Sequence, residues 1–277
     1  MLWQRVVTAV AMLLVLLPAL FHSQIEPFAT LSLVLIVAAG WEWGRLNGLT
    51  SAGALAAGVG LGVGLALLWW TGGVLQPLPA LWWTVGSVWV LLATLMLHRG
   101  VLRWTDWPVW PRRLLGWFLI ACAWLALVQA RLLGLEFLLS VLVLVWTADV
   151  AAYFGGKAFG RRKLAPSVSP GKSWEGVYSG VLGVALVGAL WLHLDRLGVT
   201  HGGSLFQRLW SDWGWGAVLV LAGLVAMSVA GDLVESLVKR SAGVKDSSRL
   251  LPGHGGVLDR VDALLPVLPL AMMVISR

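Results

Sequence analysis

Long apolar stretches alternate with short polar segments along the whole chain of 277 residues. Nine of these stretches approach the roughly 20 residues that a helix needs to cross a bilayer. They lie at residues 5–21, 25–43, 52–70, 78–97, 114–130, 137–153, 177–194, 214–231 and 257–275. The pattern predicts an all-α, polytopic integral membrane protein with about nine transmembrane helices.

The composition supports this class of protein. Hydrophobic residues make up 59% of the chain and charged residues only 12%, and the mean hydropathy is +0.85. A soluble domain carries about 25% charged residues, so this chain has too few charges to cover a surface that faces water. Its 19 tryptophans gather largely at the ends of apolar stretches, where indole rings suit the lipid headgroup region.

The distribution of positive charge predicts the orientation in the membrane. A net charge of +7 can indicate nucleic acid as a partner, but here the cations lie in short loops between apolar stretches. With the N-terminus inside, the inner loops hold 16 of the 20 Lys and Arg residues and the outer loops hold four. Such a bias is typical of cytoplasmic loops. We therefore expect a cytoplasmic N-terminus, an outer C-terminus and no nucleic acid partner.

One membrane domain over residues 1–277 is the simplest organisation. Residues 1–135 contain no motif that carries chemistry, and the glycine-rich run at 57–67 is explained by close helix packing. The half from 136 to 277 holds three polar clusters, which include the loops 154–176 and 232–256. All three clusters face the cytoplasm in the predicted topology, so we expect a catalytic half beside a scaffold half.

The first cluster spans residues 147–176 and combines Asp149 with several cations, among them Lys157 and Lys172. It ends in a Gly-Lys-Ser sequence like that of a phosphate-binding P-loop, but Pro166 stands where that motif needs glycine, so a P-loop is rejected. We expect Ser169 to cap a helix whose first residue is Pro170. Lys172 would then lie in the first turn, beside free backbone N–H groups that suit a phosphate. The alternative is that these cations only hold the loop inside.

The second cluster, residues 231–249, places Asp232, Glu235 and Ser236 on one face of a helix, because they are three and four positions apart. Lys239 and Arg240 follow one turn later. Two carboxylates beside cations suit Mg²⁺ that carries phosphates, since this ion prefers a few carboxylates with substrate oxygens. An ordinary amphipathic helix end is the alternative.

The third cluster, residues 248–266, joins a glycine-rich bend to the start of the last apolar stretch. Its bend can turn backbone N–H groups towards an anion and consists of Gly253, His254, Gly255 and Gly256. Asp259 and Asp262 share a helix face, with Arg260 between them. For the His254 imidazole a structural role is the default, and a hydrogen bond to phosphate is the alternative.

Together the clusters bring oxygen ligands, cations and flexible bends to one membrane face. Soft ligands are absent from the clusters, which favours Mg²⁺ over zinc. Metal and cations of this kind neutralise the charge of an in-line displacement at phosphorus. The sequence therefore indicates the transfer of phosphorylated groups at the boundary between membrane and cytoplasm.

Residues 236–262, SLVKRSAGVKDSSRLLPGHGGVLDRVD, resemble the signature of the phosphatidate cytidylyltransferases, also called CDP-diacylglycerol synthases. The signature positions are Ser236, Lys239, Arg240, Lys245, Asp246, His254, Gly255, Gly256, Asp259, Arg260 and Asp262. The run from Asp149 to Gly176 and the segment 231–235 resemble the same family. The resemblance covers roughly residues 147–262.

This resemblance implies that CTP and phosphatidic acid are converted into CDP-diacylglycerol and pyrophosphate with Mg²⁺, and it leaves a monovalent co-ion open. It also implies an all-helical protein of the bacterial inner membrane, assembled as a homodimer. The lipid phosphate would attack the α-phosphorus of CTP. A phosphate monoester is already an anionic nucleophile, so the protein has to position the reactants and neutralise charge.

The resemblance also carries roles for individual residues. We expect Asp232 and Asp259 to bind the metal, with Glu235 and Asp262 as nearby ligands. The catalytic group is expected to be Asp232, Asp259, Lys239, Arg260 and Asp262. Substrate binding is expected from Lys157, Lys172, Ser173, Arg240, Lys245, His254, Gly255 and Gly256.

Two other functions have to be weighed. A CTP-dependent lipid kinase would move the γ-phosphate and release CDP, but the glycine-rich bend followed by Asp259, Arg260 and Asp262 favours the cytidylyltransferase. A transporter would use Asp149 and Asp259 to bind coupling ions. Transporter sites lie near the membrane midplane and often come in inverted repeats, whereas these charges gather at one face and the two halves are unlike.

Overall fold

The computed structural model describes residues 2–99, 104–200 and 202–276 of the chain. Two cations counted in the orientation argument, Arg103 and Arg277, lie outside the described residues. The elements are α1 Leu2–Phe21, α2 Glu26–Leu46, α3 Ser51–Trp70, the 3₁₀ turn η1 Gly73–Leu75, α4 Pro79–Arg99, α5 Val109–Leu133, α6 Leu135–Phe159, β1 Lys163–Ala165, β2 Ser169–Ser173, α7 Trp174–Arg196, α8 Leu205–Trp213, α9 Gly216–Ser241, α10 Leu258–Val261 and α11 Leu264–Ile275.

Each of the nine predicted apolar stretches forms helix over most of its length, which confirms a helical fold. Within the described ranges, six helices are long and apolar enough to cross a membrane, namely α2, α3, α5, α6, α7 and α9. Helices α1 and α4 contain shorter apolar segments, Val6–Phe21 and Pro79–Leu95. Their exposed surfaces carry many large hydrophobic side chains, as expected of helices that face lipid.

The last apolar stretch does not form the single helix that was expected over residues 257–275. It divides into α10 and α11 at Asp262 and Ala263, although both residues keep helical dihedral angles. The cause is Pro266, which has no N–H to donate to the carbonyl of Asp262 four residues earlier. The charged start of the stretch is thereby set apart from the apolar helix that follows.

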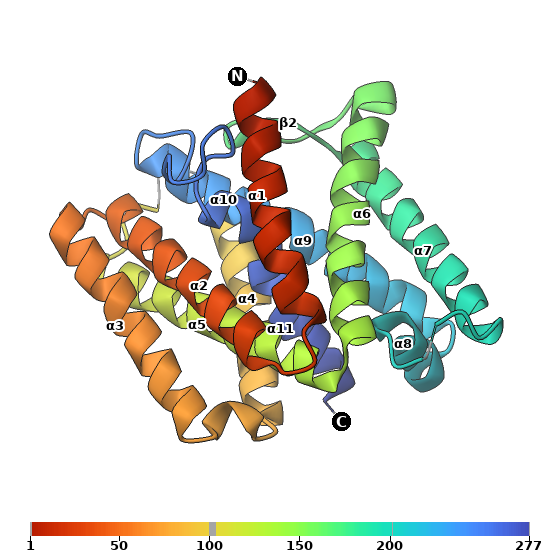
Figure 1. Ribbon diagram of the computed structural model, residues 1–277. Helices are drawn as coiled ribbons and strands as arrows, with labels where there is room; N and C mark the ends of the chain where they lie inside the picture. The colour runs from red at the N-terminus through yellow and green to blue at the C-terminus, as the bar shows by residue number, and fades with distance from the viewer. Residues whose placement is uncertain (1, 100–103, 201, 277) are drawn as a thin grey trace.

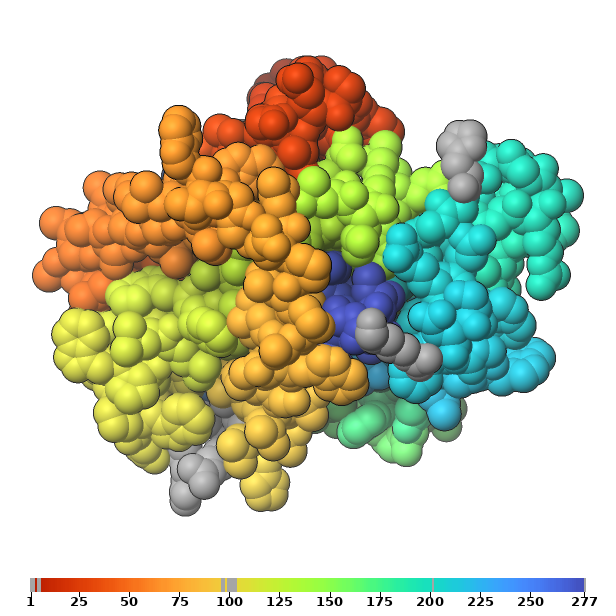
Figure 2. Space-filling view, turned by 90° about the horizontal axis from the view of Figure 1, so that it is seen from below, coloured from red at the N-terminus to blue at the C-terminus, as the bar shows by residue number. Residues whose placement is uncertain are grey.

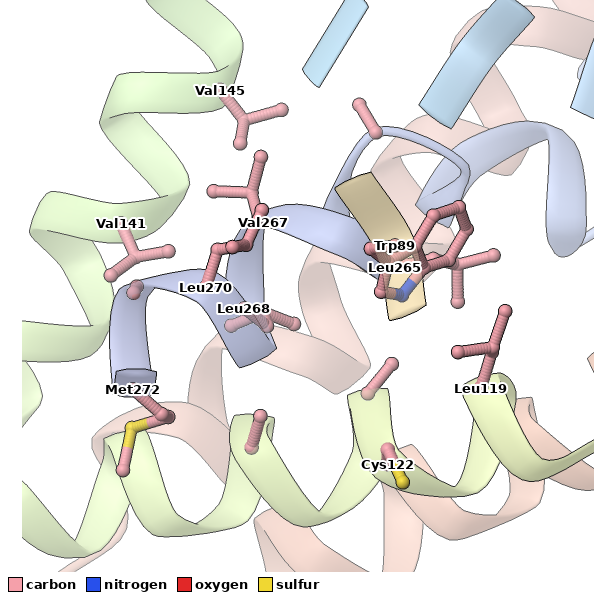
Figure 3. Packing of buried hydrophobic residues seen from close by; sticks show 14 of the residues in the cluster. Trp89, Leu119, Cys122, Val141, Val145, Leu265, Val267, Leu268, Leu270 and Met272 are labelled. Carbon is pink, nitrogen blue, oxygen red and sulfur yellow. The ribbon is translucent and has the colours of Figure 1, made fainter. Parts of the chain in front are cut away.

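Helix α11 lies at the centre of the molecule and organises the core. It packs against α4, α5, α6, α8 and α9, and Figure 3 shows Val267 and Leu270 close to Val141 and Val145 of α6. Seen from the end opposite the N-terminus, the last part of the chain emerges between α4 and α8 (Figure 2). Because α11 is held on several sides, the adjoining α10 has a fixed position relative to the helices around it.

The polar segment between α6 and α7 differs from the prediction. Strands β1 and β2 form an antiparallel hairpin in which Lys163 pairs with Ser173 and Ala165 with Ser169. Ser169 is therefore not a helix cap. Helix α7 begins after Ser173, whose hydroxyl accepts the N–H of Gly176 at 3.2 Å. Lys172 consequently extends from a strand and not from a first helical turn.

The polar segments of the second half lie at one end of the molecule. In Figure 1 the hairpin and the loop between α9 and α10 lie at the same end as the N-terminus, and the C-terminus lies at the other end. Helix α6 continues to Phe159 and α9 to Ser241, so both loops are shorter than the polar segments in the sequence. This arrangement brings the three sequence clusters to one end.

Candidate active site

The Asp259 side chain forms hydrogen bonds with α9, with the loop that follows α9 and with the glycine-rich bend. Its Oδ1 accepts a hydrogen bond from Lys239 Nζ of α9 at 2.6 Å. Its Oδ2 accepts the N–H and the hydroxyl of Ser247, both at 2.9 Å, and the N–H of Gly256 at 2.7 Å. The side chain is only 6% exposed. Asp259 therefore ties the end of α9, the following loop and the glycine-rich bend to α10.

These contacts keep the Asp259 carboxylate ionised. Burial by itself would raise the pKa of Asp259, but the hydrogen bonds from Lys239 and from the backbone N–H of Gly256 and Ser247 outweigh burial, and the net shift is downward. Helix α10 lies outside the six candidate membrane spans. A carboxylate whose charged form is favoured at this position suits the binding of a cation.

Lys239 is shared between two carboxylates. Besides Asp259, its ammonium group pairs with Glu235 one turn earlier on α9. Lys239 and Glu235 are both buried, so each carboxylate relies on the shared cation for charge compensation. The predicted catalytic Lys239 and the predicted metal ligand Glu235 thus lie in one buried network.

Asp232 lies on the same helix and pairs with the hairpin. Lys172 Nζ is 2.6 Å from its Oδ2, and the hydroxyl of Ser236 donates to its Oδ1 at 3.1 Å, which confirms the shared face of Asp232 and Ser236. Asp149 of α6 interacts electrostatically with both Lys172 and Asp232. The first and second sequence clusters therefore meet at this ion pair.

Asp262 adds a further carboxylate beside Asp232. It accepts the N–H of Ala263 at 2.8 Å, and burial together with the charge of Asp232 raises its pKa.

Among the described residues, no three Asp, Glu, His or Cys side chains stand close enough to hold a metal ion by themselves. The crowded oxygen ligands nevertheless fit Mg²⁺, which takes one or two carboxylates and completes its shell with water and substrate phosphate.

Glu42 of α2 is part of this network, although the sequence did not single it out. It is completely buried, and its carboxylate accepts four hydrogen bonds from the loop region more than 200 positions away. The donors are Ser247 Oγ at 3.1 Å, Ser248 Oγ at 2.5 Å, Val257 N at 2.9 Å and Leu258 N at 2.7 Å. The half without motifs therefore holds the active-site loop in place. An acidic residue inside an apolar stretch was the available signal.

Two glycines of the bend are required by their surroundings. Gly255 has a φ of +84°, a conformation that side chains rarely adopt, and a Cβ there would lie 2.6 Å from Oδ2 of Asp259. A Cβ on Gly256 would collide with the Ser247 hydroxyl and the Glu42 carboxylate. The glycines thus let the backbone approach the two carboxylates.

A cavity of about 530 Å³ opens beside this network. It is lined by Arg45, Leu46, Ala242, Val244, Lys245, Asp246, Ser247, Ser248 and Arg249. Lys245, a predicted substrate-binding residue, therefore lines a cavity of a size that suits a small molecule. Arg45, from the N-terminal half, lines it as well.

Several predicted residues stand apart from the charged network. Lys157, Arg240 and Arg260 are exposed, and the Arg240 guanidinium donates to the carbonyl of Val244 at 3.3 Å. Ser173 uses its hydroxyl as the cap of α7. His254 lies in the bend with its Nδ1 buried and without a hydrogen-bond partner among the residues that the structure describes. The substrate contacts expected of these residues stay predictions.

Comparison with known proteins covers almost the whole chain. Residues 3–277 match the cytidylyltransferase family. A phosphatidate cytidylyltransferase of Pseudomonas aeruginosa is 39% identical over 275 residues, which are 97% of this chain and 95% of that protein. The phosphatidate cytidylyltransferase of Brucella melitensis is 33% identical over 74% of this chain and 78% of its own length. That of Haemophilus influenzae is 48% identical over 49% of this chain and 44% of its own.

Proposed function

The chain belongs to the cytidylyltransferase family, and we propose that it transfers CMP from CTP to phosphatidic acid, with CDP-diacylglycerol and pyrophosphate as products. The observation that carries this proposal is the Asp259 network. It brings the signature residues Lys239 and Gly256, together with Ser247, into direct contact with one buried carboxylate. The phosphatidate cytidylyltransferases among its relatives support the same substrates.

The chemistry is a displacement at the α-phosphorus of CTP. An oxygen of the lipid phosphate forms a bond to this phosphorus, and the bond from the phosphorus to the bridging oxygen of pyrophosphate breaks. The attacking phosphate monoester is already an anion, so no side chain has to remove a proton. Lys172, Lys239 and Lys245 offer positive charge, and the contact with Asp259 positions Lys239 among them.

Asp232 and Asp259 are the residues that would hold Mg²⁺, with Glu235 and Asp262 next to them. Bound there, the ion would neutralise charge on the phosphate oxygens. Lys172 and Lys239 now pair with these carboxylates and would turn towards substrate phosphates. In this exchange Mg²⁺ would compensate the carboxylates that the lysines leave, and the phosphates would compensate the lysines, so no buried charge would lose its partner.

The proposed setting is the bacterial inner membrane, with about nine spans and the active site facing the cytoplasm. The bias of positive charge towards the end that holds the site supports this orientation. Phosphatidic acid would enter from the bilayer and CTP from the cytoplasm. Dimeric assembly, which the family resemblance implies, stays a prediction.

The direct test uses purified protein in mixed micelles with phosphatidic acid, Mg²⁺ and CTP labelled in the cytosine ring. We expect the label to enter the lipid phase with the release of one pyrophosphate per lipid. Release of CDP with a lipid alcohol as the acceptor would identify a kinase and contradict the proposal. Absence of turnover with either acceptor would favour a transporter.

A further inference from the structure

The cavity between the end of α2 and the loop after α9 is strongly basic. Three cations line it, Arg45, Lys245 and Arg249, against the single carboxylate of Asp246, so its wall carries three positive charges and one negative charge. Ser247 and Ser248 also line this wall, but their hydroxyls donate to the Glu42 and Asp259 carboxylates. Arginine and lysine are the usual partners of phosphate oxygens in proteins.

The cavity adjoins the reacting centre through one residue. Ser247 lines the cavity, and its N–H and hydroxyl both donate to Asp259 at 2.9 Å. A ligand in the cavity therefore lies next to the carboxylate that we expect to bind the metal. A triphosphate held by the cations would have its inner phosphate directed at the site of transfer.

Arg45 is held in place from the N-terminal half. It follows Glu42 by about one turn of α2, and Glu42 is tied to Val257 and Leu258 by hydrogen bonds of 2.9 and 2.7 Å. The guanidinium also stacks on the ring of Trp41 at 4.9 Å. These contacts fix the distance between Arg45 and the loop that carries Lys245 and Arg249.

We infer that this cavity is the subsite for the polyphosphate of CTP, with Arg45, Lys245 and Arg249 as its cations. The inference rests on the proposed function and adds to it a residue of the N-terminal half and an assignment of the two substrates to different places. Of the three cations, only Lys245 belongs to the sequence signature, so Arg45 and Arg249 are assigned by the geometry alone.

The lipid phosphate is assigned to the face of α9 about two turns before Lys239. Lys172 pairs with Asp232 there, next to the start of α7, where Trp174 and Tyr178 are exposed. Exposed aromatic rings beside a cation suit the headgroup level of a bilayer. The two phosphates would then approach one another across the α9 residues that lie between them.

The test compares the kinetics of Arg45→Ala and Arg249→Ala with those of Lys172→Ala. We expect the first two to raise the KM for CTP about tenfold or more, as the loss of a charge-assisted phosphate contact does, and to leave the KM for phosphatidic acid within about twofold. Lys172→Ala should show the opposite pattern. Binding of labelled CTP by equilibrium dialysis, without phosphatidic acid, should weaken in the Arg45 and Arg249 variants only.

Arg196→Ala provides the matched control, because it removes an exposed arginine from the last turn of α7 at the opposite end of the molecule. Arg45→Lys keeps the charge and should recover part of the CTP affinity, which a purely structural role would not explain. Unchanged CTP binding in both alanine variants, or a raised KM for phosphatidic acid in its place, would overturn the subsite. A wild-type protein without CTP turnover would contradict the proposed function itself.

Discussion

At position 256, any side chain larger than hydrogen would occupy the space of two functional groups. The Glu42 carboxylate and the Ser247 hydroxyl both lie where a Cβ would be built. The N–H of Gly256 also donates to Asp259 at 2.7 Å. This single residue therefore shows why the bend is glycine-rich: the backbone itself binds the carboxylates, and no side chain fits between them.

Gly256→Ala should consequently disturb the Asp259 network. Overpacking of this kind costs about 1–3 kcal/mol, so we expect kcat to fall by roughly tenfold to a hundredfold as Asp259 moves away from Lys239. Gly223→Ala is the control, because a Cβ at Gly223 on α9 meets no atom within 4 Å. Steady-state kinetics of both variants test this prediction. Equal kcat values would mean that the bend accommodates a methyl group without disturbing Asp259.

The sequence predicts several of the residue contacts, because they depend on local spacing. Asp232 and Ser236 share a face as a spacing of four requires, and their hydrogen bond confirms it. The hydrogen bonds of Glu42 to Ser247 and Leu258 bridge two distant parts of the chain, and no local pattern predicts them. The sequence shows an acidic residue inside an apolar stretch, but it does not show which groups that carboxylate binds.

At the scale of elements, pairing with the neighbouring strand overrides a local helix signal. Ser169 followed by Pro170 is a good helix start, yet both residues belong to β2, because Ser169 and Ser173 pair with β1. Ser173 caps α7 in place of Ser169, and the negative charge of Glu175 in the first turn complements the dipole of this helix. Lys172 thereby reaches Asp232 from a strand.

Helix α2 acts on the active site through Glu42, and Glu42→Gln tests this. Each carboxylate oxygen accepts two donors, so either orientation of the amide places its NH₂ group against a hydroxyl and a backbone N–H. An unsatisfied buried group costs about 1–3 kcal/mol. We expect kcat to fall about tenfold or more and backbone amides of the 247–258 segment to exchange hydrogen faster.

Glu26→Gln is the matched control for that experiment, because Glu26 is exposed in the first turn of the same helix. Its kinetics and hydrogen exchange should equal those of the wild type. Glu42→Asp keeps the charge and should recover part of the rate. Wild-type kcat together with unchanged exchange in Glu42→Gln would show that α2 does not position the loop.

At the scale of the whole molecule, the fold places its chemistry at one end of a hydrophobic bundle. The composition predicts the helical membrane protein, because apolar length is a property of each stretch by itself. It does not predict that α11 would be the buried centre, since this depends on how all the helices pack. The hydrophobic stretch 257–275 is for this reason both a core element and the support of the active site.

The orientation of the bundle can be tested with single cysteines, because native Cys122 is buried. Ala158→Cys at the active-site end and Val199→Cys at the opposite end introduce exposed thiols. In intact spheroplasts, a membrane-impermeant maleimide should label the cysteine at 199 and should reach the one at 158 only after permeabilisation. The reverse pattern would place the active site outside the cytoplasm.

The most direct test of the account is the rate of cytidylyl transfer by Asp259→Asn, measured with labelled CTP and phosphatidic acid. This substitution removes the charge that pairs with Lys239 and an expected metal ligand. Without this charge the reacting phosphates lose electrostatic stabilisation, so we expect at least about a hundredfold loss of turnover, whereas Lys239 keeps Glu235 as a partner and insertion into the membrane should be normal. Asp106→Asn, at an exposed aspartate, should retain wild-type activity. Near-normal transfer by Asp259→Asn would contradict the account, because Asp259 would then not be the centre of the site.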